Sequence, residues 1–290
     1  MPRDIIEIDG RPAHQKKSPE TPEVSVAVTR GIRAQVDAAV NGDLYTKVAQ
    51  FWAPFMQRIF VSLRGNLSGF GGDTFGELRE FRDGYLYGEA PYVQTVERAL
   101  LNFVARESPS LLKHLMNVRK FGTEVIHNLP GKVETINYIL TGLALHDIGK
   151  LVTGNGILLH RGVFEPEQMA KMTTHTERGY YLLLALGMPD AVVDMALRHH
   201  QVGWENRERF AKSYPKDVEG EPLPPHVRLG RGIDTTVAMF ENRPDRPSAP
   251  PEKIIAKMEE LRPIHGDDVT DVIVHLVSSY PLTKWIDPHL

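Results

Sequence analysis

Hydrophobic residues recur three or four positions apart along most of this chain, the spacing that gathers them on one face of an α-helix. The first such run covers residues 31–63, and glycines between Gly65 and Gly72 interrupt it. No strand pairing is evident. The fold is therefore predicted to be all-α, with later helices expected near residues 93–105, 109–126, 133–145, 166–186, 189–200, 227–241, 252–261 and 268–279.

Changes in composition divide the chain into three parts. Residues 1–30 are polar and mixed, which predicts a loose arm, and residues 31–90 form a smaller helical unit. Residues 91–290 carry the remaining helices and form the main domain. Within it, residues 203–225 are rich in proline and charge, and loops of this length inside a domain are usually functional or disordered.

Composition then narrows the class of protein. The 290 residues carry a net charge of −3, which gives no sign of a DNA or RNA partner. The most apolar early stretch, residues 51–63, contains Pro54 and Arg58 and is too short to cross a bilayer, so no transmembrane segment is expected. The absence of cysteine excludes disulfides and thiolate metal sites and favours a cytoplasmic location.

The sequence LALHDIGKL places His146 and Asp147 directly after apolar residues at the end of an expected helix. An ordinary interpretation is a polar helix end, with Gly149 as the stop signal and Lys150 interacting with the helix dipole. Two strongly polar groups at the edge of a core nevertheless need partners. A metal ion would satisfy both, because imidazole offers a nitrogen and a carboxylate can bridge two ions.

Further histidines and an aspartate follow on other expected helices. His199 and His200 end the helix at 189–200, and His175 and Asp234 lie inside two others. Each of them, taken singly, is most simply an ordinary helix residue. The chain has twelve histidines; His160 is left open because it follows soon after His146, and the ordinary interpretation is kept for His14, His127, His226, His265, His275 and His289.

The order of the remaining residues resembles the HD superfamily, in which a histidine, a His-Asp pair and a later aspartate on separate helices converge on metal. Additional histidines specify a two-metal version. Over about residues 91–280 the chain resembles HD-GYP domains, the HD subgroup known as cyclic di-GMP phosphodiesterases. The matching segments are HDIGK at 146–150, His175-Thr-Glu-Arg-Gly, His199-His200, Tyr214-Pro215, Gly220, Pro224, Arg228, Asp234 and Asn242-Arg243-Pro244, preceded by His114.

The chain departs from the HD-GYP pattern at several positions. Val237 stands three residues after Asp234, where many members have a second aspartate. Ser110 stands four residues before His114, where some members have a glutamate that supports a third metal, so the resemblance implies two metals. Ser213 replaces the glycine of the tyrosine-proline motif, and the loop before that motif is longer than usual.

The resemblance implies a metal-dependent cyclic di-GMP phosphodiesterase, built as an HD-domain helical bundle after a smaller helical unit. It implies hydrolysis of a phosphodiester bond by a hydroxide that bridges two divalent ions, iron or manganese before zinc, nickel or cobalt. The implied roles are catalysis for Asp147 and Lys150; metal binding for His114, His146, Asp147, His175, His199, His200 and Asp234; and substrate binding for Lys150, Tyr214, Arg243 and Arg246.

Two other functions fit the same residues. A cyclic di-GMP sensor or interaction module with little turnover is favoured by Val237, Ser213 and the long loop, and opposed by the complete ligand set and Lys150. Another HD-type nucleotide phosphohydrolase is opposed by the tyrosine-proline motif at Tyr214. Residues 31–90 match no known motif, and their place before the domain suggests, by analogy alone, regulation, a homodimer or a signalling partner.

Overall fold

The computed structural model describes residue 52 and residues 90–130, 136–154, 162, 164–202, 214, 223–242 and 247–287. All of these residues belong to one compact unit, Asn41–Leu290. The expected arm at residues 1–30 and nearly all of the expected unit at residues 31–90 lie outside the described residues. The division of the chain into those parts therefore stays a prediction.

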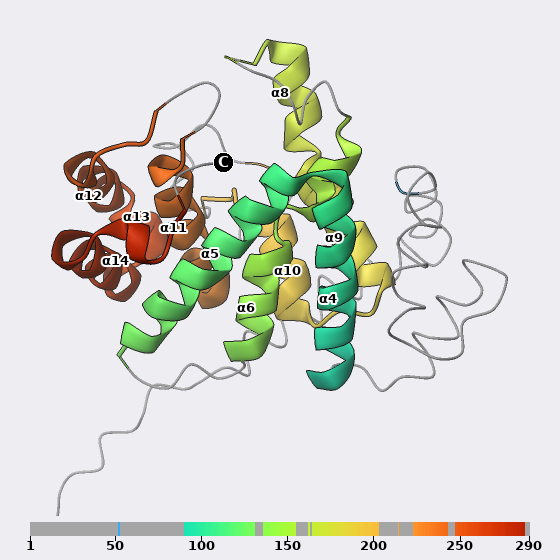
Figure 1. Ribbon diagram of the computed structural model, residues 1–290, viewed down its shortest axis with the longest axis horizontal. Helices are drawn as coiled ribbons and strands as arrows, with labels where there is room; N and C mark the ends of the chain where they lie inside the picture. Colours follow the sequence, from blue (N-terminus) through green and yellow to red (C-terminus); the bar gives the residue numbers. More distant parts are fainter. Residues whose placement is uncertain are drawn as a thin grey trace, which may run out of the picture. The chain divides into compact units, whose positions relative to one another are not determined.

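The described residues form helices joined by turns, with no strand among them, which confirms the all-α prediction. Helix α5 packs against α4, α6, α11 and α14, and α12 to α14 gather beside α11 at one end (Figure 1). The elements are α4 Ala90–Glu107, α5 Pro109–Asn128, α6 Ile136–Leu145, η1 Ile148–Val152, α8 Pro166–Thr173, α9 His175–Ala185, α10 Asp190–Arg198, α11 Pro225–Phe240, α12 Pro251–Glu260, α13 Arg262–His265, α14 Asp267–Ser279 and η3 Leu282–Lys284.

Helix α5 shows how local sequence sets the bounds of a helix. The side chain of Ser108 accepts a hydrogen bond from the backbone N–H of Leu111 at 3.3 Å, and Pro109 follows as the first helical residue, as predicted. The buried face of α5 includes Phe121, whose ring centroid lies 6.0 Å from that of Trp285. The face that the apolar spacing predicted therefore packs into the core.

The prediction of a single helix over residues 166–186 is wrong, because the helix is interrupted at Thr174. Helix α8 ends at Thr173 and α9 begins at His175. The Thr174 hydroxyl donates to the carbonyl of Lys171 at 2.7 Å, and the Thr173 hydroxyl bonds back to its preceding turn at 2.8 Å. Such side-chain bonds compete with the helical ladder. His175 therefore opens a helix instead of lying inside one.

Two other helices end just before residues expected to carry chemistry. Helix α6 ends one residue before His146, and the 3-10 helix η1 begins one residue after Asp147. Helix α10 ends one residue before His199, although the sequence predicted that it includes His200. These polar residues thus lie in turns, where their side chains are not confined to one helix face.

Trp52, from the segment expected to form the N-terminal unit, is helical and fully buried. Its indole Nε1 donates a hydrogen bond to the backbone carbonyl of Arg178 in α9 at 3.0 Å. This hydrogen bond ties residue 52 to the helix that His175 opens.

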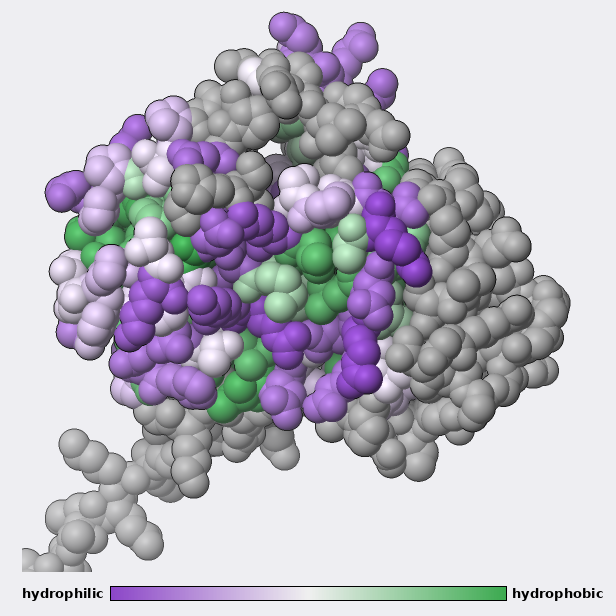
Figure 2. All heavy atoms as spheres, in the orientation of Figure 1, coloured by the Kyte–Doolittle hydropathy of each residue, from purple (hydrophilic) through white to green (hydrophobic). Residues whose placement is uncertain are grey.

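The described helices include none that is long and apolar enough to cross a membrane. On the face shown in Figure 2, hydrophilic residues are interspersed with small hydrophobic patches. The exposed large hydrophobic side chains of the described part are Met116 on α5, Met169 on α8 and Tyr280 just after α14. Large apolar side chains otherwise gather in the core.

The Phe121→Ala variant is expected to lower the free energy of unfolding by about 3–5 kcal/mol, because it leaves a cavity where a fully buried ring packs near Trp285. Denaturant unfolding of the metal-free protein measures this. Met116→Ala, on the same helix at a position that is 42% exposed, is the control and should change stability by less than about 0.5 kcal/mol. Equal losses in the two variants would contradict the assigned core.

Candidate metal centre

Histidines and aspartates from several helices and turns meet in one buried cluster. They come from the middle of α5, the turn after α6, the first residue of α9, the turn after α10 and the interior of α11. The cluster comprises the residues singled out in the sequence as ligands: His114, His146, Asp147, His175, His199, His200 and Asp234.

The carboxylate of Asp147 lies at the centre of the cluster, and its two oxygens face different histidines. Oδ1 lies 3.0 Å from Nε2 of His175 and 3.5 Å from Nε2 of His199. Oδ2 lies 3.6 Å from Nε2 of His114 and 3.5 Å from Nε2 of His146. Asp147 therefore separates two groups of imidazoles and belongs to both.

The first group gains a second carboxylate from α11. Oδ1 of Asp234 lies 3.1 Å from Nε2 of His114 and 3.6 Å from Nε2 of His146. Potential ligand atoms of His114, His146 and Asp147 all lie within 4.8 Å of one another. The carboxylates of Asp147 and Asp234 thus both lie close to the imidazoles of His114 and His146.

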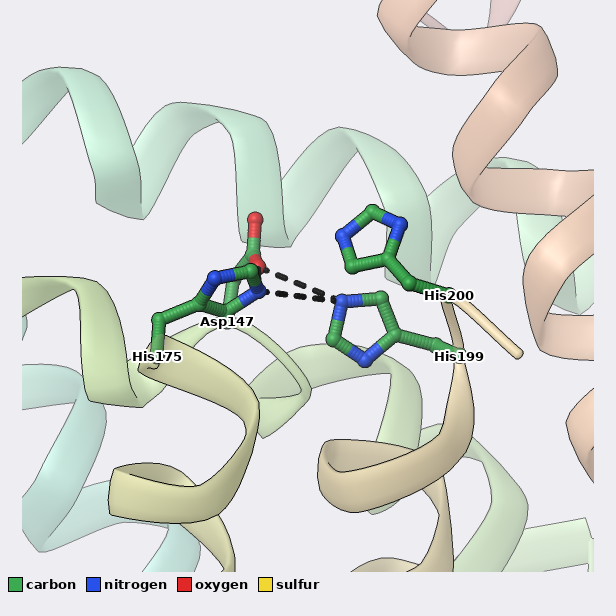
Figure 3. Close-up of side chains that lie close together, drawn as sticks. All are labelled: Asp147, His175, His199 and His200. Carbon is green, nitrogen blue, oxygen red and sulfur yellow. Dashed lines mark hydrogen bonds and ion pairs between the residues drawn. The ribbon is translucent and has the colours of Figure 1, made fainter. Parts of the chain in front are cut away.

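The second group gains an additional histidine from the turn after α10. The ring of His200 lies 4.1 Å from that of His199 and 5.3 Å from that of His175, between centroids. Figure 3 shows His175 beside Asp147 and the rings of His199 and His200 approaching from a different element. Ligand atoms of all four residues lie within 4.8 Å of one another.

Hydrogen bonds between Nδ1 and backbone carbonyls fix the orientation of three of these histidine rings. Nδ1 of His146 and of His175 lies 2.8 and 2.7 Å from the carbonyl oxygen three positions earlier. Nδ1 of His199 lies 2.9 Å from the carbonyl four positions earlier. A carbonyl oxygen can only accept, so each Nδ1 donates this hydrogen bond and each Nε2 is directed at the cluster. His114 differs, because its Nδ1 lies 2.8 Å from Oε2 of Glu241.

Burial and neighbouring charges set the protonation of most of the cluster. Burial lowers the pKa of His199 to about 4 and holds the pKa of His200 well below its usual value, so both rings are neutral at pH 7. Burial would raise the pKa of Asp147 and Asp234. At Asp147, interactions with Lys150 and neighbouring histidines outweigh this effect of burial. At Asp234, interactions with histidines outweigh it, so the pKa values of both carboxyl groups lie well below the usual range.

His114 is the exception in this pattern. Burial would lower its pKa, but contacts with Asp234 and Glu241 outweigh burial and raise the pKa to about 9. In the metal-free protein a proton on His114 therefore partly neutralises two carboxylates. A cation that binds here competes with that proton, as is usual for metal ligands.

The donor atoms match what a divalent cation requires. Nε2 of His114, Nε2 of His146 and Oδ1 of Asp147 are buried without a hydrogen-bond partner among the described residues. Unpaired buried polar atoms are costly. Imidazole nitrogen and carboxylate oxygen together suit divalent transition metals. The cluster therefore fits the binding of divalent metal.

A pocket of about 250 Å³ reaches the cluster. The Lys150 ammonium forms an ion pair with Asp147, and Lys150 also lines this pocket, so an anionic group entering it meets a cation beside the ligands. The lining residues are Lys150, His199, His200, Arg231, Asp234, Thr235, Ala238 and Met239.

Tyr214, expected to bind substrate, lies against the second group. Its ring centroid is 4.5 Å from that of His200 and 6.0 Å from that of His175. Burial raises the pKa of its phenol, which therefore stays protonated and able to donate a hydrogen bond. Arg243 and Arg246 lie outside the described residues, and their roles stay predictions.

The sequence interpretation missed two residues at the cluster, Arg231 and Glu241. Nη1 of Arg231 donates to the carbonyls of His199 at 3.3 Å and Gln201 at 2.9 Å, and Arg231 lines the pocket. Glu241 is fully buried and contacts the first group. The two residues stand three before and seven after Asp234, and helical spacing from Asp234 is the signal that could have found them.

His265, which the sequence analysis interpreted as an ordinary residue without a role in metal binding, lies in the core. His265 closes α13, is 1% exposed and has no hydrogen-bond partner for either ring nitrogen among the described residues. Burial lowers its pKa to about 3, so it is a neutral core residue. His14, His160 and His289 lie outside the described residues.

The HD domain family model matches residues 111–261, just over half of the chain. The chain belongs to the HD domain family. The match extends from before His114 to beyond Asp234, so it includes the entire cluster, and it confirms the HD resemblance predicted from the sequence.

Curated relatives of this HD domain protein carry names of cyclic dinucleotide enzymes. A cyclic di-GMP phosphodiesterase of Thermotoga maritima is 27% identical over 46% of the chain and 35% of its own length. The 3'3'-cGAMP-specific phosphodiesterase 3 of Vibrio cholerae is 25% identical over 58% of the chain and 35% of its own length. The cyclic di-GMP phosphodiesterase response regulator RpfG of Xanthomonas campestris is 30% identical over 48% of the chain and 39% of its own length.

The similarity therefore spans little more than a third of the length of each of these relatives. It concerns a shared domain, and each named activity is that of a longer protein.

The Gly149→Ala variant is expected to disrupt the metal centre, because a Cβ on Gly149 would overlap the carbonyl oxygen of His175 and lie 2.6 Å from the backbone nitrogen of Gly179. The displaced η1 carries Asp147 with it. Stability should fall by about 3 kcal/mol and Mn²⁺ affinity by at least about tenfold, measured by denaturant unfolding and calorimetric titration.

Gly179→Ala is the matched control, since its Cβ would lie 3.3 Å from the backbone nitrogen of Gly149 across the same contact. It should change stability by less than about 1 kcal/mol and leave Mn²⁺ binding intact. Equal effects of the two variants would show that the close approach does not set the ligand spacing.

Proposed function

We propose that this HD domain hydrolyses a phosphodiester bond of a cyclic dinucleotide, with cyclic di-GMP as the first candidate substrate, at a pair of divalent metal ions. The observation that carries the proposal is the carboxylate of Asp147, whose two oxygens face separate groups of histidines. A carboxylate in this position can bridge two ions. The named activities of the relatives support the substrate class.

Each ion has its own proposed ligands. One ion would be held by His114, His146, Asp147 and Asp234, and the other by Asp147, His175, His199 and His200. Ligands of imidazole and carboxylate type favour iron or manganese, with zinc, nickel or cobalt as alternatives. When bound, the ions supply Lewis-acid activation of water and neutralise charge on the phosphodiester.

The protein side chains around the cluster bind and orient the substrate in this proposal. Lys150 lies at the pocket beside Asp147 and contacts a non-bridging phosphate oxygen. Tyr214 packs on His200 and offers its hydroxyl or ring face to the nucleotide. Arg243 and Arg246 are retained as candidate contacts to the second phosphate or a guanine edge.

A second function is favoured by a specific difference from the HD-GYP pattern. Val237 is fully buried and apolar at a position where many members carry a carboxylate. That change, with Ser213, favours a module that binds cyclic di-GMP with little turnover. The Vibrio relative also makes 3'3'-cGAMP a candidate substrate, and other HD-type nucleotide hydrolysis stays open as an alternative.

The Asp147→Asn variant tests the proposal directly. After anaerobic reconstitution with Fe²⁺ or Mn²⁺, the wild type should hold two ions and convert cyclic di-GMP to its linear dinucleotide or GMP. The variant should lose at least one ion, with a fall in turnover of at least about 10³-fold, since it removes the shared ligand charge. Elemental analysis and chromatography of products measure both.

Asp194→Asn is the control, because Asp194 is another buried aspartate, near His226 and outside the cluster. It should keep both ions and most of the activity. Nucleotide binding by the metal-loaded wild type without turnover of cyclic di-GMP, 3'3'-cGAMP or other nucleotides would contradict the enzymatic proposal and favour the binding module.

The Lys150→Met variant separates metal binding from catalysis. It removes the ammonium beside Asp147 and keeps an unbranched side chain of similar length. Both ions should remain bound, while kcat/KM for the cyclic dinucleotide should fall by about 10²–10³-fold, because a charge opposite the phosphate is lost. Unchanged kcat/KM would remove Lys150 from the proposed substrate site.

A further inference from the structure

The ligand histidines differ in what holds their rings. His146, His175 and His199 each direct Nδ1 to a backbone carbonyl three or four positions earlier. All three follow or begin a helix, where the last carbonyls of the preceding turn have no partner within the helical ladder. Local backbone therefore orients these rings.

His114 has no such local acceptor, because it lies inside α5, which continues to Asn128. Carbonyls in a helix interior are already engaged by the N–H groups four residues later. The acceptor for Nδ1 of His114 comes instead from a residue 127 positions away, the carboxylate of Glu241, whose Oε2 lies at 2.8 Å.

The carboxylate of Glu241 is itself held in place. Its other oxygen, Oε1, accepts a hydrogen bond at 2.8 Å from the side-chain amide of Asn117, one turn after His114 on α5. The Asn117 amide also bonds the backbone of Asp287, donating to its carbonyl at 3.0 Å and accepting from its N–H at 3.1 Å. α5 and the C-terminal segment thus fix where the carboxylate lies.

A carboxylate at the position of Glu241 is energetically unfavourable unless these hydrogen-bond partners compensate for its burial. Glu241 is fully buried and follows the last residue of α11, where the helix dipole disfavours negative charge. It also stands one turn beyond Val237, the apolar residue three positions after Asp234. Residues 234 and 237 lie on α11, and the residue that caps this helix, Glu241, supplies a second carboxylate one turn after Val237.

We infer that Glu241 is the positioning residue for His114: it accepts the Nδ1–H bond and thereby aims Nε2 at the point between Asp147 and Asp234. A carboxylate behind a ligand imidazole fixes its tautomer and strengthens metal binding. The inference rests on the proposed metal centre and assigns Glu241 to one of its two ions, the one held by His114, His146 and Asp234.

The Glu241→Gln variant tests the assignment, because it keeps the shape of the side chain and removes its charge. Mn²⁺ is titrated into metal-free protein by calorimetry with no nucleotide present. One of the two binding steps should weaken by about 10–100-fold, while the other keeps its wild-type affinity. Asn117→Ala, which removes one hydrogen bond to Glu241 and two to the backbone of Asp287, should weaken the same step by a smaller factor.

Glu97→Gln is the matched control. Glu97 is also buried, and its carboxylate bonds Arg119 and Thr141. This variant should lower thermal stability without changing either Mn²⁺ step. If Glu241→Gln binds Mn²⁺ with wild-type affinity in both steps, the inference is wrong, whatever the stability of the variant. A wild type that binds no pair of ions overturns the metal centre itself, which keeps the two failures apart.

Discussion

A carboxylate buried among imidazoles is the constraint on which the rest of this domain depends. Asp147 is 1% exposed, and removing an ionised group from water is tolerated only where opposite charge or coordinating partners surround it. Those partners come from α5, η1, α9 and the turns after α6 and α10, so the helices must pack in one arrangement to bring them together. The core that surrounds the cluster, including Leu145 and Ile148 on either side of the His-Asp pair, holds that arrangement.

Helix ends are the means by which the chain places its histidines. A helix that stops leaves free carbonyls, and here His146, His175 and His199 use them to fix their rings. The end of a helix thus has two effects on the neighbouring histidine: it lets the side chain turn toward the cluster, and it supplies the acceptor for the Nδ1 hydrogen bond. His114, inside a helix, needs the long-range carboxylate of Glu241 instead.

Most of the architecture and the chemical composition of the site could be predicted from the sequence. Periodic apolar residues reveal helices, and the order of histidines and aspartates reveals a family whose members bind metal. The break at Thr174 was missed, although no apolar side chain lies between Met172 and Tyr180; the threonine hydroxyls there compete with the helical ladder. Glu241 was missed for another reason: its partner is 127 residues away, and its spacing of seven residues after Asp234 was the local signal for it.

The contact between η1 and α9 involves backbone on both sides, where Gly149 meets the carbonyl of His175 and the nitrogen of Gly179. The separation between Asp147 and His175 is therefore set by main-chain atoms, which are the same for every amino acid. Substitutions of apolar residues elsewhere in the bundle are expected to change stability more than they change this separation. The freedom to vary the pocket and the surface without retuning the ligands follows from one position, Gly149, that has no room for a side chain against α9.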